Sequence, residues 1–153
     1  MNIQKADITD FDKIKVISDE LRQIHIEGRP DLFKNITIFD MEFFETFFGE
    51  NVCYIVKEND DILGYTLLKV TTTKADAHMT KRKVAFVEEI AVKKGYRGKG
   101  IGSMLLSKVE EHAKEANANV IDFRVFDFNE NAKKFYSKHG YKVRAFEMEK
   151  WII

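Results

Sequence analysis

The chain has 153 residues, of which 44% are hydrophobic and 33% charged, a size and composition typical of one folded domain. Lysine plus arginine equals aspartate plus glutamate at 25 each, so no overall basic field would attract nucleic acid or an anionic membrane. This composition excludes collagen-like and intrinsically disordered chains. We therefore expect a single domain over residues 1–153, with no nucleic-acid and no membrane partner.

Cysteine and histidine usage gives no sign of a metal site or a disulfide. The single cysteine, Cys53, lies in a strand-like run and is expected to be a small buried hydrophobe. The four histidines fall in no metal-ligand spacing. No stretch approaches the about 20 apolar residues that span a bilayer, and the first residues lack an apolar signal core. These features favour a cytoplasmic protein without a metal.

The first half of the chain is expected to form a strand, two helices and a β-hairpin. Apolar residues recur at helical spacing after a short β-prone run, with Thr9 or Asp10 as the helix cap. Five phenylalanines suggest a second helix that covers the core. The predicted elements are a strand at 3–6, a helix from Phe11 to about Gly28, a helix within 31–48, and antiparallel strands at 52–58 and 62–72.

The second half predicts a strand, a glycine-rich turn, a helix and a parallel strand, which together form a βαβ unit. A last helix would have Asn129 or Asp127 as its cap and Gly140 as its stop. The predicted elements are strands at 83–92 and 120–126, a helix from Ile101, a helix at 129–139, and one or two strands within 141–152. The architecture is an α/β or α+β sandwich with a mixed sheet.

The glycine-rich turn is the most informative segment, and it reads Gly95-Tyr96-Arg97-Gly98-Lys99-Gly100-Ile101-Gly102. Glycines let the backbone approach a ligand, and the start of the following helix favours an anion. Arg97 and Lys99 add positive charge suited to phosphate. A dinucleotide fingerprint would need glycine in place of Ser103, and a Walker loop would need Lys and Ser or Thr at 101 and 102. The turn therefore predicts a phosphate or pyrophosphate site, but neither NAD nor ATP.

Residues 97–102 match in full the pattern Arg or Gln, any two residues, Gly, any one, then Gly or Ala. This pattern resembles the acetyl-coenzyme A loop of the GNAT superfamily of N-acetyltransferases. The resemblance extends to Glu89–Val92 before the turn and to Asn129–Tyr136 and Gly140-Tyr141 after it. It implies the GNAT fold, an α+β sandwich whose mixed sheet has about six to seven strands flanked by about four helices.

The resemblance also assigns residues to the binding of acetyl-CoA as co-substrate, without a metal. The pantetheine arm is expected to pair with the strand at Ile90, Ala91 and Val92, through the main chain of the first and last of these. The pyrophosphate is expected on the loop and helix start. Its contacts would come from Arg97, Gly98, Lys99, Gly100, Ile101, Gly102 and Ser103, and further donor contacts from Asn129, Ala132 and Phe135.

Three residues are candidates for catalysis. Tyr136 matches the tyrosine that protonates the departing thiolate, although an aromatic residue beside Phe135 would equally suit packing. Glu88 and Glu89 interrupt an apolar strand, where consecutive side chains point to opposite faces unless a bulge intervenes. The pair resembles the Glu-Asp pair of polyamine acetyltransferases, which favours Glu88 as base and Glu89 as a cation-binding side chain. The alternative is that one or both are solvated or ion-paired.

The leading hypothesis is acetyl transfer from acetyl-CoA to a primary amine of a small cationic acceptor by direct attack in a ternary complex. Acidic residues support a cationic acceptor, namely Asp31, Asp40, Glu42, Glu45, Glu88 and Glu89. Acetylation of a protein N-terminus and a non-catalytic acyl-CoA-binding module stay open. His25 would either pack in a loop or contact the acceptor. The apolar segment 146–153 would either join a homodimer contact or pack inside.

Overall fold

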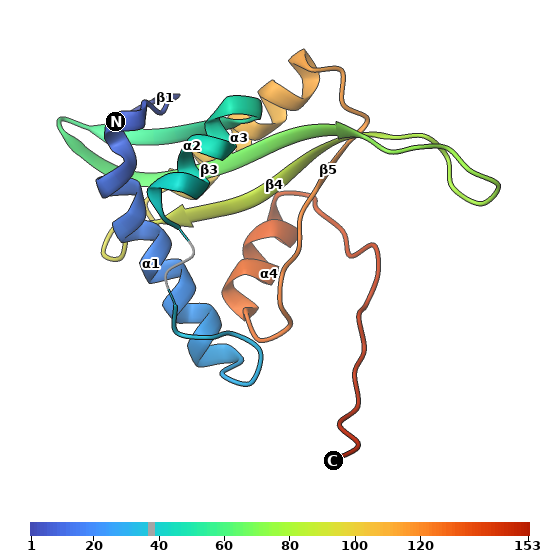
Figure 1. Cartoon of the computed structure of the whole chain (residues 1–153). Coiled ribbons are helices and arrows are strands. Elements are labelled where there is room, and N and C mark those ends of the chain that lie inside the picture. The colour runs from blue at the N-terminus through green and yellow to red at the C-terminus, as the bar shows by residue number, and fades with distance from the viewer. Residues whose placement is uncertain (37–38) are drawn as a thin grey trace. The chain divides into compact units, whose positions relative to one another are not determined.

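The structure is a computed structural model that describes residues 1–36 and 39–153 (Figure 1). It divides into two compact units, Met1–Phe123 and Arg124–Ile153, which are described one at a time. The single domain expected over residues 1–153 stays a prediction. In the described residues no helix is both long and apolar enough to cross a membrane.

The first unit contains a mixed sheet whose strands follow one another in chain order. Each neighbouring pair from β1 to β4 is antiparallel, and β5 runs parallel to β4. The mixed sheet, the hairpin and the parallel βαβ unit are thus confirmed. The described residues form five strands and not the six to seven we expected: β1 (Asn2–Lys5), β2 (Val52–Glu58), β3 (Asp61–Thr72), β4 (Lys83–Val92) and β5 (Val120–Asp122).

Helices cover both faces of this sheet (Figure 1). Phenylalanines from the first two α-helices pack on one face together with Ile55, Tyr65 and Leu67, so these aromatic residues are core, as predicted. The third α-helix packs on the other face through Val109 and Ala113. The helices of this unit are α1 (Phe11–Gly28), α2 (Met41–Glu50) and α3 (Ile101–Glu115), and a short 3₁₀ helix η1 (Ile8–Asp10) precedes α1.

The start of α1 differs in detail from the prediction. Asp7 caps η1, because its carboxylate accepts the Thr9 N–H at 2.9 Å while Asp10 accepts the Asp7 N–H at 2.9 Å. Asp10 holds the N-cap position of α1, but its side chain makes no cap bond there. A reciprocal capping box therefore fixes the chain one turn earlier than Thr9 or Asp10 would.

Cys53 and α2 show how burial and exposure divide in this unit. Cys53 is fully buried in the core, as predicted, and burial raises the pKa of its thiol.

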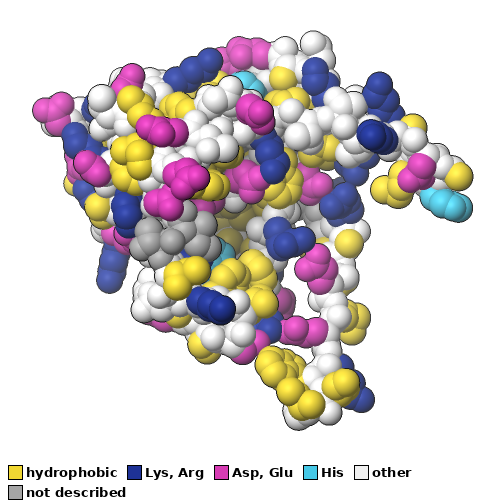
Figure 2. Space-filling model, viewed as in Figure 1, with side chains coloured by type: hydrophobic (Ala, Val, Ile, Leu, Met, Phe, Trp, Pro, Cys, Tyr) yellow, Lys and Arg dark blue, Asp and Glu magenta, His cyan; other side chains and the backbone are white. Residues whose placement is uncertain are grey.

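The outer face of α2 is acidic, with exposed Glu42, Glu45 and Glu50. Acidic side chains gather over this part of the surface in Figure 2.

The second unit contains α4 (Glu130–Lys138) and an extended segment. Asn129 caps α4 by accepting the Ala132 N–H at 3.1 Å, and Gly140 ends it with φ 85°, both as predicted. The prediction of one or two strands within 141–152 is wrong, because these residues form no strand. A strand needs a neighbour to satisfy its main chain, and Val143, Phe146 and Met148 are 72%, 83% and 94% exposed. Self-association through this segment stays a prediction.

The predicted strand at 120–126 is also shorter than expected, since β5 ends at Asp122. Its ladder with β4 runs only from the Val84–Val120 pair to the Phe86–Asp122 pair. β5 thus ends at Asp122, although the β propensity of the residues that follow is high.

Gly64 permits the close approach of α3 to the sheet. A Cβ atom at Gly64 would lie 2.9 Å from the carbonyl oxygen of Ala91 and 2.9 Å from Cγ2 of Ile101. We expect Gly64→Ala to lower the free energy of unfolding by about 1–3 kcal/mol, measured by urea denaturation. Gly49→Ala is the control, because nothing lies within 4 Å of its added Cβ. Equal stability of the two variants would contradict this packing.

Candidate active site

A β-bulge interrupts β4 at Glu88. Leu67 of β3 pairs with Glu89 and Leu68 pairs with Val87, so Glu88 is left between two consecutive pairs. The extra residue shifts the alternation of side chains between the two faces of the sheet. Val87 therefore packs in the α3-facing core with Val109, whereas Glu89 reaches a side chain of α1.

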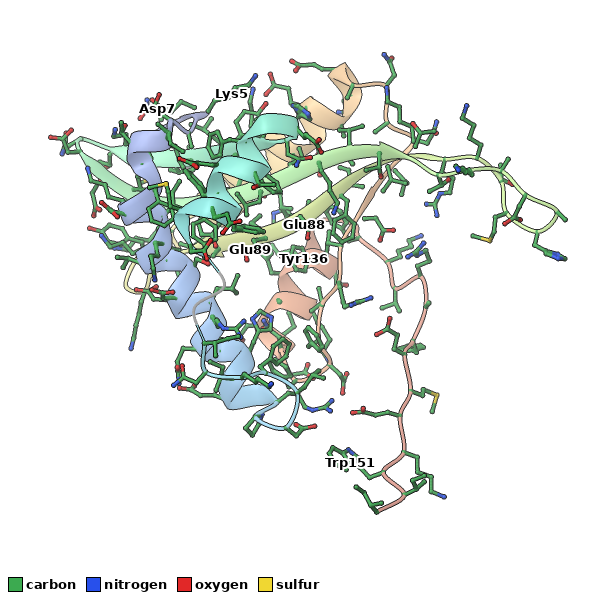
Figure 3. The ribbon with its side chains drawn as sticks, viewed as in Figure 1. Lys5, Asp7, Glu88, Glu89, Tyr136 and Trp151 are labelled. Carbon is green, nitrogen blue, oxygen red and sulfur yellow. The ribbon has the colours of Figure 1, made fainter. Side chains whose placement is uncertain are left out.

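The two glutamates consequently have different surroundings (Figure 3). Glu89 is half-buried and accepts hydrogen bonds from the Tyr65 hydroxyl and, at 3.4 Å, from Ser18 Oγ of α1. Burial raises the pKa of Glu89, and these two hydrogen bonds oppose that rise. Glu88 is exposed and forms an ion pair with Lys69. One alternative from the sequence, an ion-paired carboxylate, is therefore realised at Glu88.

Beyond the bulge, one edge of β4 carries no neighbouring strand. The ladder between β4 and β5 ends at Phe86, and among the described residues no other strand pairs with that edge. The main chain from Glu88 to Val92 is therefore not part of a ladder there. Ile90 and Val92 place their side chains on the α3 side, and Ala91 lies in the opposite core. Such an edge suits the main-chain pairing predicted for Ile90, Ala91 and Val92.

The loop between β4 and α3 has the conformation that its glycines predict. Gly95, Gly98 and Gly100 have φ of 87°, 77° and 82°, values that residues with a Cβ rarely adopt. A turn is closed by the Tyr96 N–H, which donates to the Lys93 carbonyl at 3.0 Å. The loop therefore presents its backbone, with few side chains, at the start of α3.

The start of α3 fits an anion such as a pyrophosphate. The helix has Gly100 at its N-cap, and its first main-chain hydrogen bond runs from the Met104 N–H to the Gly100 carbonyl at 3.0 Å. The N–H groups of Ile101 and Gly102 precede that bond and have no carbonyl of α3 to pair with. No acidic residue lies in the first turn. Both the N–H groups and the helix dipole therefore favour negative charge here.

The two cations of the loop have different partners. The Arg97 Nε donates to the Val92 carbonyl at 3.0 Å, and Nη2 lies 3.7 Å from Glu20 of α1, which also accepts the Lys94 N–H at 2.6 Å. Arg97 thus fastens the loop to β4 and α1. Lys99 lies over the Tyr96 ring at 4.7 Å and, within the described residues, forms no ion pair. Lys99 is therefore the better placed of the two predicted phosphate contacts.

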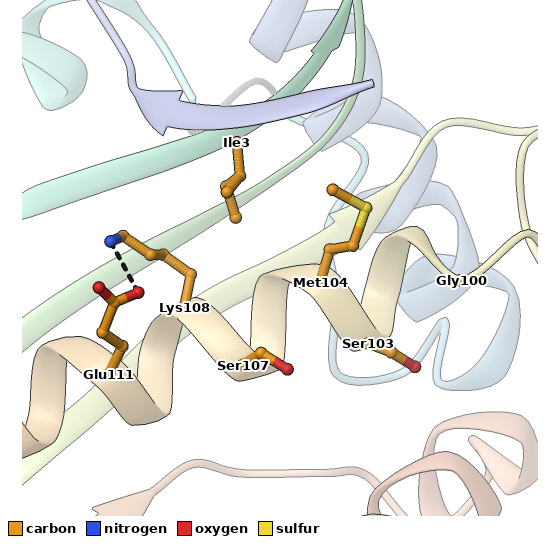
Figure 4. Close-up of a pocket in the computed structure, with 7 residues that line it drawn as sticks. All are labelled: Ile3, Gly100, Ser103, Met104, Ser107, Lys108 and Glu111. Carbon is orange, nitrogen blue, oxygen red and sulfur yellow. Dashed lines mark hydrogen bonds and ion pairs between the residues drawn. The ribbon is translucent and has the colours of Figure 1, made fainter.

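A shallow groove of about 400 Å³ runs along α3 from this loop (Figure 4). Gly100 and Ser103, which are both predicted to contact acetyl-CoA, line the end of the groove nearest to the loop. Lys108 and Glu111 form an ion pair of 2.9 Å farther along the helix. The groove is lined by Ile3, Gly100, Ser103, Met104, Ser107, Lys108 and Glu111.

The second unit holds the remaining predicted site residues on or beside α4. Tyr136 packs edge-on against Tyr141, with ring centroids 6.0 Å apart. Burial and the neighbouring Tyr141 raise the pKa of the Tyr136 phenol, so the hydroxyl keeps its proton at physiological pH. Phe135 packs on His139 at 4.5 Å, while Asn129 and Ala132 are joined by the cap bond. The first unit therefore contains the loop and both glutamates, and the second contains Tyr136, Phe135, Asn129 and Ala132.

Three residues of the first unit were missed from the sequence: Ser18, Glu20 and Tyr65. Ser18 interrupts the apolar stripe of α1 one turn after Ile14, and this was a usable signal. The sequence gives no such signal for Glu20 and Tyr65, because their hydrogen-bond partners lie 74 and 24 residues away along the chain.

The histidines show packing and no metal cluster. His25 packs against Phe33 with ring centroids 5.2 Å apart, and its Nδ1 lies 3.0 Å from the Leu21 carbonyl. Burial lowers the pKa of His25. Residues 1–36 and 39–153 contain no group of three or more His, Cys, Asp or Glu side chains that could hold a metal ion.

A model of the acetyltransferase (GNAT) family matches residues 16–141. The match includes β4, the glycine-rich loop, α3 and α4, and it covers most of the chain. The chain belongs to the acetyltransferase (GNAT) family. The resemblance drawn from the sequence is thereby confirmed.

Relatives with sequence similarity include named N-acetyltransferases. Streptothricin acetyltransferase A of Bacillus subtilis is 33% identical over 95 residues, which are 62% of this chain and 55% of that protein. Thialysine N-epsilon-acetyltransferase of Bos taurus is 37% identical over 60 residues, 39% of this chain and 35% of that protein. The chain therefore spans only about half, or less, of the length of these relatives.

Solved structures support the fold over the whole chain. The BH1408 protein of Bacillus halodurans, solved as a point mutant, has a TM-score of 0.96 at 23% identity, with 100% of both chains covered. A predicted acetyltransferase of Clostridium acetobutylicum, solved with acetyl-CoA, has a TM-score of 0.71 at 21% identity and covers 97% of this chain and 95% of its own. At these identities the likeness concerns the fold, and the GNAT fold is confirmed.

Gly102 is the second residue of α3 and lies where an anion would approach the backbone. We expect Gly102→Val to weaken CoA binding by about tenfold, since a branched side chain would displace one charge-assisted hydrogen bond. The measurement is the rise in melting temperature with CoA, which reports binding to the folded state.

Gly49→Val is the matched control, because it makes the same change in α2 away from the loop. NAD is the control ligand and is expected to leave the melting temperature unchanged. Stabilisation of the parent by NAD but not by CoA would contradict the loop assignment.

Proposed function

We propose that the protein is an acetyl-CoA-dependent N-acetyltransferase that acetylates the primary amine of a small cationic acceptor by direct attack in a ternary complex. One observation carries the proposal. β4 bears a half-buried carboxylate, Glu89, and leads into the glycine-rich loop and the start of α3, whose main-chain N–H groups favour an anion. A group that holds phosphate and a base that accepts a proton are thus built from one continuous stretch of chain.

The donor side rests on main-chain groups. The N–H groups at the start of α3 and the Lys99 ammonium would hold the pyrophosphate, and the open edge of β4 would pair with the pantetheine arm. Bound acetyl-CoA would supply an acetyl group activated as a thioester. Because main-chain groups bind this donor, Arg97 is free to stabilise the loop through Val92 and Glu20.

The acceptor side requires a base, because most alkyl amines are protonated at neutral pH. The sequence favoured Glu88 as base and Glu89 as the cation-binding residue. We propose the reverse roles. Glu88 is exposed and neutralised by Lys69, whereas burial raises the pKa of Glu89 toward the range in which a carboxylate accepts protons effectively. A carboxylate with little solvation is also the stronger attraction for an ammonium group.

Tyr136 is our proposed acid. As the amine nitrogen bonds to the acetyl carbon, the carbon–sulfur bond breaks and the thiolate takes up a proton. The Tyr136 phenol holds its proton at physiological pH and can donate it to the thiolate, although burial raises its pKa and makes it a weaker acid than an exposed tyrosine. Glu89 takes one proton from the ammonium group before the attack and passes it to solvent. After the attack the nitrogen loses a second proton, which replaces through solvent the one that Tyr136 gave to the thiolate, so each turnover releases one net proton.

A small cationic acceptor is supported by the surface of α2 and by the relatives. Glu42 and Glu45 are exposed and, in the described residues, have no ion-pair partner. Asp31 and Asp40 contribute less, because Arg29 pairs with Asp31 and the Phe43 N–H bonds to Asp40. Relatives named for thialysine and for L-ornithine acetylation act on amino acids with a side-chain amine. Acetylation of a protein N-terminus is the alternative acceptor class.

Glu89→Gln tests the base. We expect it to lower kcat at neutral pH by about 10² to 10⁴, because the amide cannot accept the amine proton. The defect should shrink as the pH rises, since more of the amine is then already deprotonated. The measurement is thiol release from acetyl-CoA with a panel of diamines, basic amino acids and an N-terminal peptide.

Glu88→Gln is the matched control, and it should change kcat less than about threefold. If Glu88→Gln shows the pH-dependent loss and Glu89→Gln does not, the sequence-based roles are correct and ours are reversed. No turnover by the parent with any amine, despite CoA binding, would favour the non-catalytic module.

Tyr136→Phe tests the acid separately. The change removes one hydroxyl and keeps the ring that packs on Tyr141, so CoA affinity should be unchanged while kcat falls by about 10² to 10⁴. Single-turnover kinetics at saturating acetyl-CoA measure this step. An unchanged kcat would assign Tyr136 to packing and the proton to water.

A further inference from the structure

A small polar cluster lies within the apolar core between the sheet and α1. It consists of Glu89 of β4, Tyr65 of β3 and Ser18 of α1. Tyr65 is fully buried and Ser18 is 6% exposed, and both are surrounded by the aromatic core that α1 and α2 contribute. Burial of a hydroxyl group destabilises the fold unless the group forms a hydrogen bond. The carboxylate of Glu89 accepts a hydrogen bond from each of these two hydroxyl groups.

The two hydroxyls converge on one atom. Tyr65 Oη and Ser18 Oγ both donate to Oε2 of Glu89, and in the described residues no donor reaches Oε1. The carboxylate is therefore held from one side only. Thr66 supports the same strand position, because its hydroxyl donates to the main-chain carbonyl of Glu89 at 2.9 Å. The side chain and the backbone of Glu89 are thus both anchored to β3.

We propose that Tyr65 and Ser18 are positioning residues that hold Oε2 of Glu89, so that Oε1 receives the proton of the acceptor amine. This inference rests on the proposed role of Glu89 as base. Hydrogen bonds to the ionised form keep the carboxylate charged although it is half-buried. Without them the carboxylate would be protonated more easily and would rotate freely, and a base must be both ionised and aimed at its proton.

Other charged and titratable groups around Glu89 act less directly. Glu88 on β4 raises the pKa of Glu89, and Arg22 on α1 lowers it, both through space. Cys53 on β2 is buried, and the charge of Glu89 contributes to the rise in the pKa of its thiol. α2 contributes Phe44 and Phe47 to this core. Tyr65 and Ser18 are therefore the groups whose removal changes Glu89 most specifically.

The test is the pH dependence of kcat/KM with one acceptor amine, whose own titration is the same in every variant. Activity falls at low pH as the base becomes protonated. Tyr65→Phe removes a bond to the ionised carboxylate, which raises its pKa, so this fall should move to higher pH by about one unit. Ser18→Ala should move it in the same direction by less, because its bond is longer at 3.4 Å.

Tyr54→Phe is the matched control. Its hydroxyl lies 2.9 Å from His112 Nδ1 of α3, in the core on the other face, so the pH profile should be unchanged. Melting temperatures of all three variants separate loss of folding from loss of positioning. If Tyr65→Phe does not fold, Ser18→Ala tests the proposal alone. A folded Tyr65→Phe with the parent profile would overturn it.

Glu89→Gln separates failure of this inference from failure of the proposed function. If Glu89→Gln loses the part of the low-pH fall that comes from Glu89 and keeps only the dependence set by the amine, while the fall is unshifted in Tyr65→Phe and Ser18→Ala, Glu89 is the base and the positioning role is wrong. If Glu89→Gln keeps the parent profile and rate, the proposed base itself is wrong. In the Glu89→Gln background, Tyr65→Phe should have no further effect on the profile.

Discussion

One extra residue in β4 determines the arrangement of the first unit. The side chains of a strand alternate with a period of two, so Val87, Glu89 and Ala91 would all face the same side of a regular strand. The bulge at Glu88 divides them: Val87 enters the core under α3, while Glu89 and Ala91 enter the core under α1. Without the bulge, Glu89 would point into the apolar core beneath α3, and burial of its charge there would be unfavourable.

The same interruption organises both halves of the candidate site. β5 pairs with β4 only before the bulge, so in the part of the chain that the structure describes no strand pairs with this edge of β4 after it, where we propose that the donor binds. On the α1 side, the redirected carboxylate accepts hydrogen bonds from Tyr65 and Ser18 within a largely apolar layer. A bulge next to an active site is a common way to direct one side chain while the rest of the sheet continues.

Polar contacts of α1 connect the proposed base to the glycine-rich loop. α1 carries Ser18, which contacts the proposed base, and Glu20, which bonds to the Lys94 N–H and approaches Arg97 in the loop. These two residues lie about half a turn apart on the same helix. The same helix therefore contacts both the proposed base and the glycine-rich loop.

By itself, the sequence determined the features that local physics dictates. Glycine spacing predicted the positive φ values of the loop, the periodicity predicted α1, α2 and α3, and Asn129 and Gly140 predicted both ends of α4. Tertiary structure decided the rest. The surroundings of Glu88 and Glu89 depend on strand register, and the partners of Arg97 and Glu89 come from distant elements. Residues 141–152 form no strand, although their pattern predicted one or two. The physical reason is that a strand, a bulge or a buried charge is stabilised by non-local partners, whereas a turn or a helix cap is stabilised by residues a few positions away.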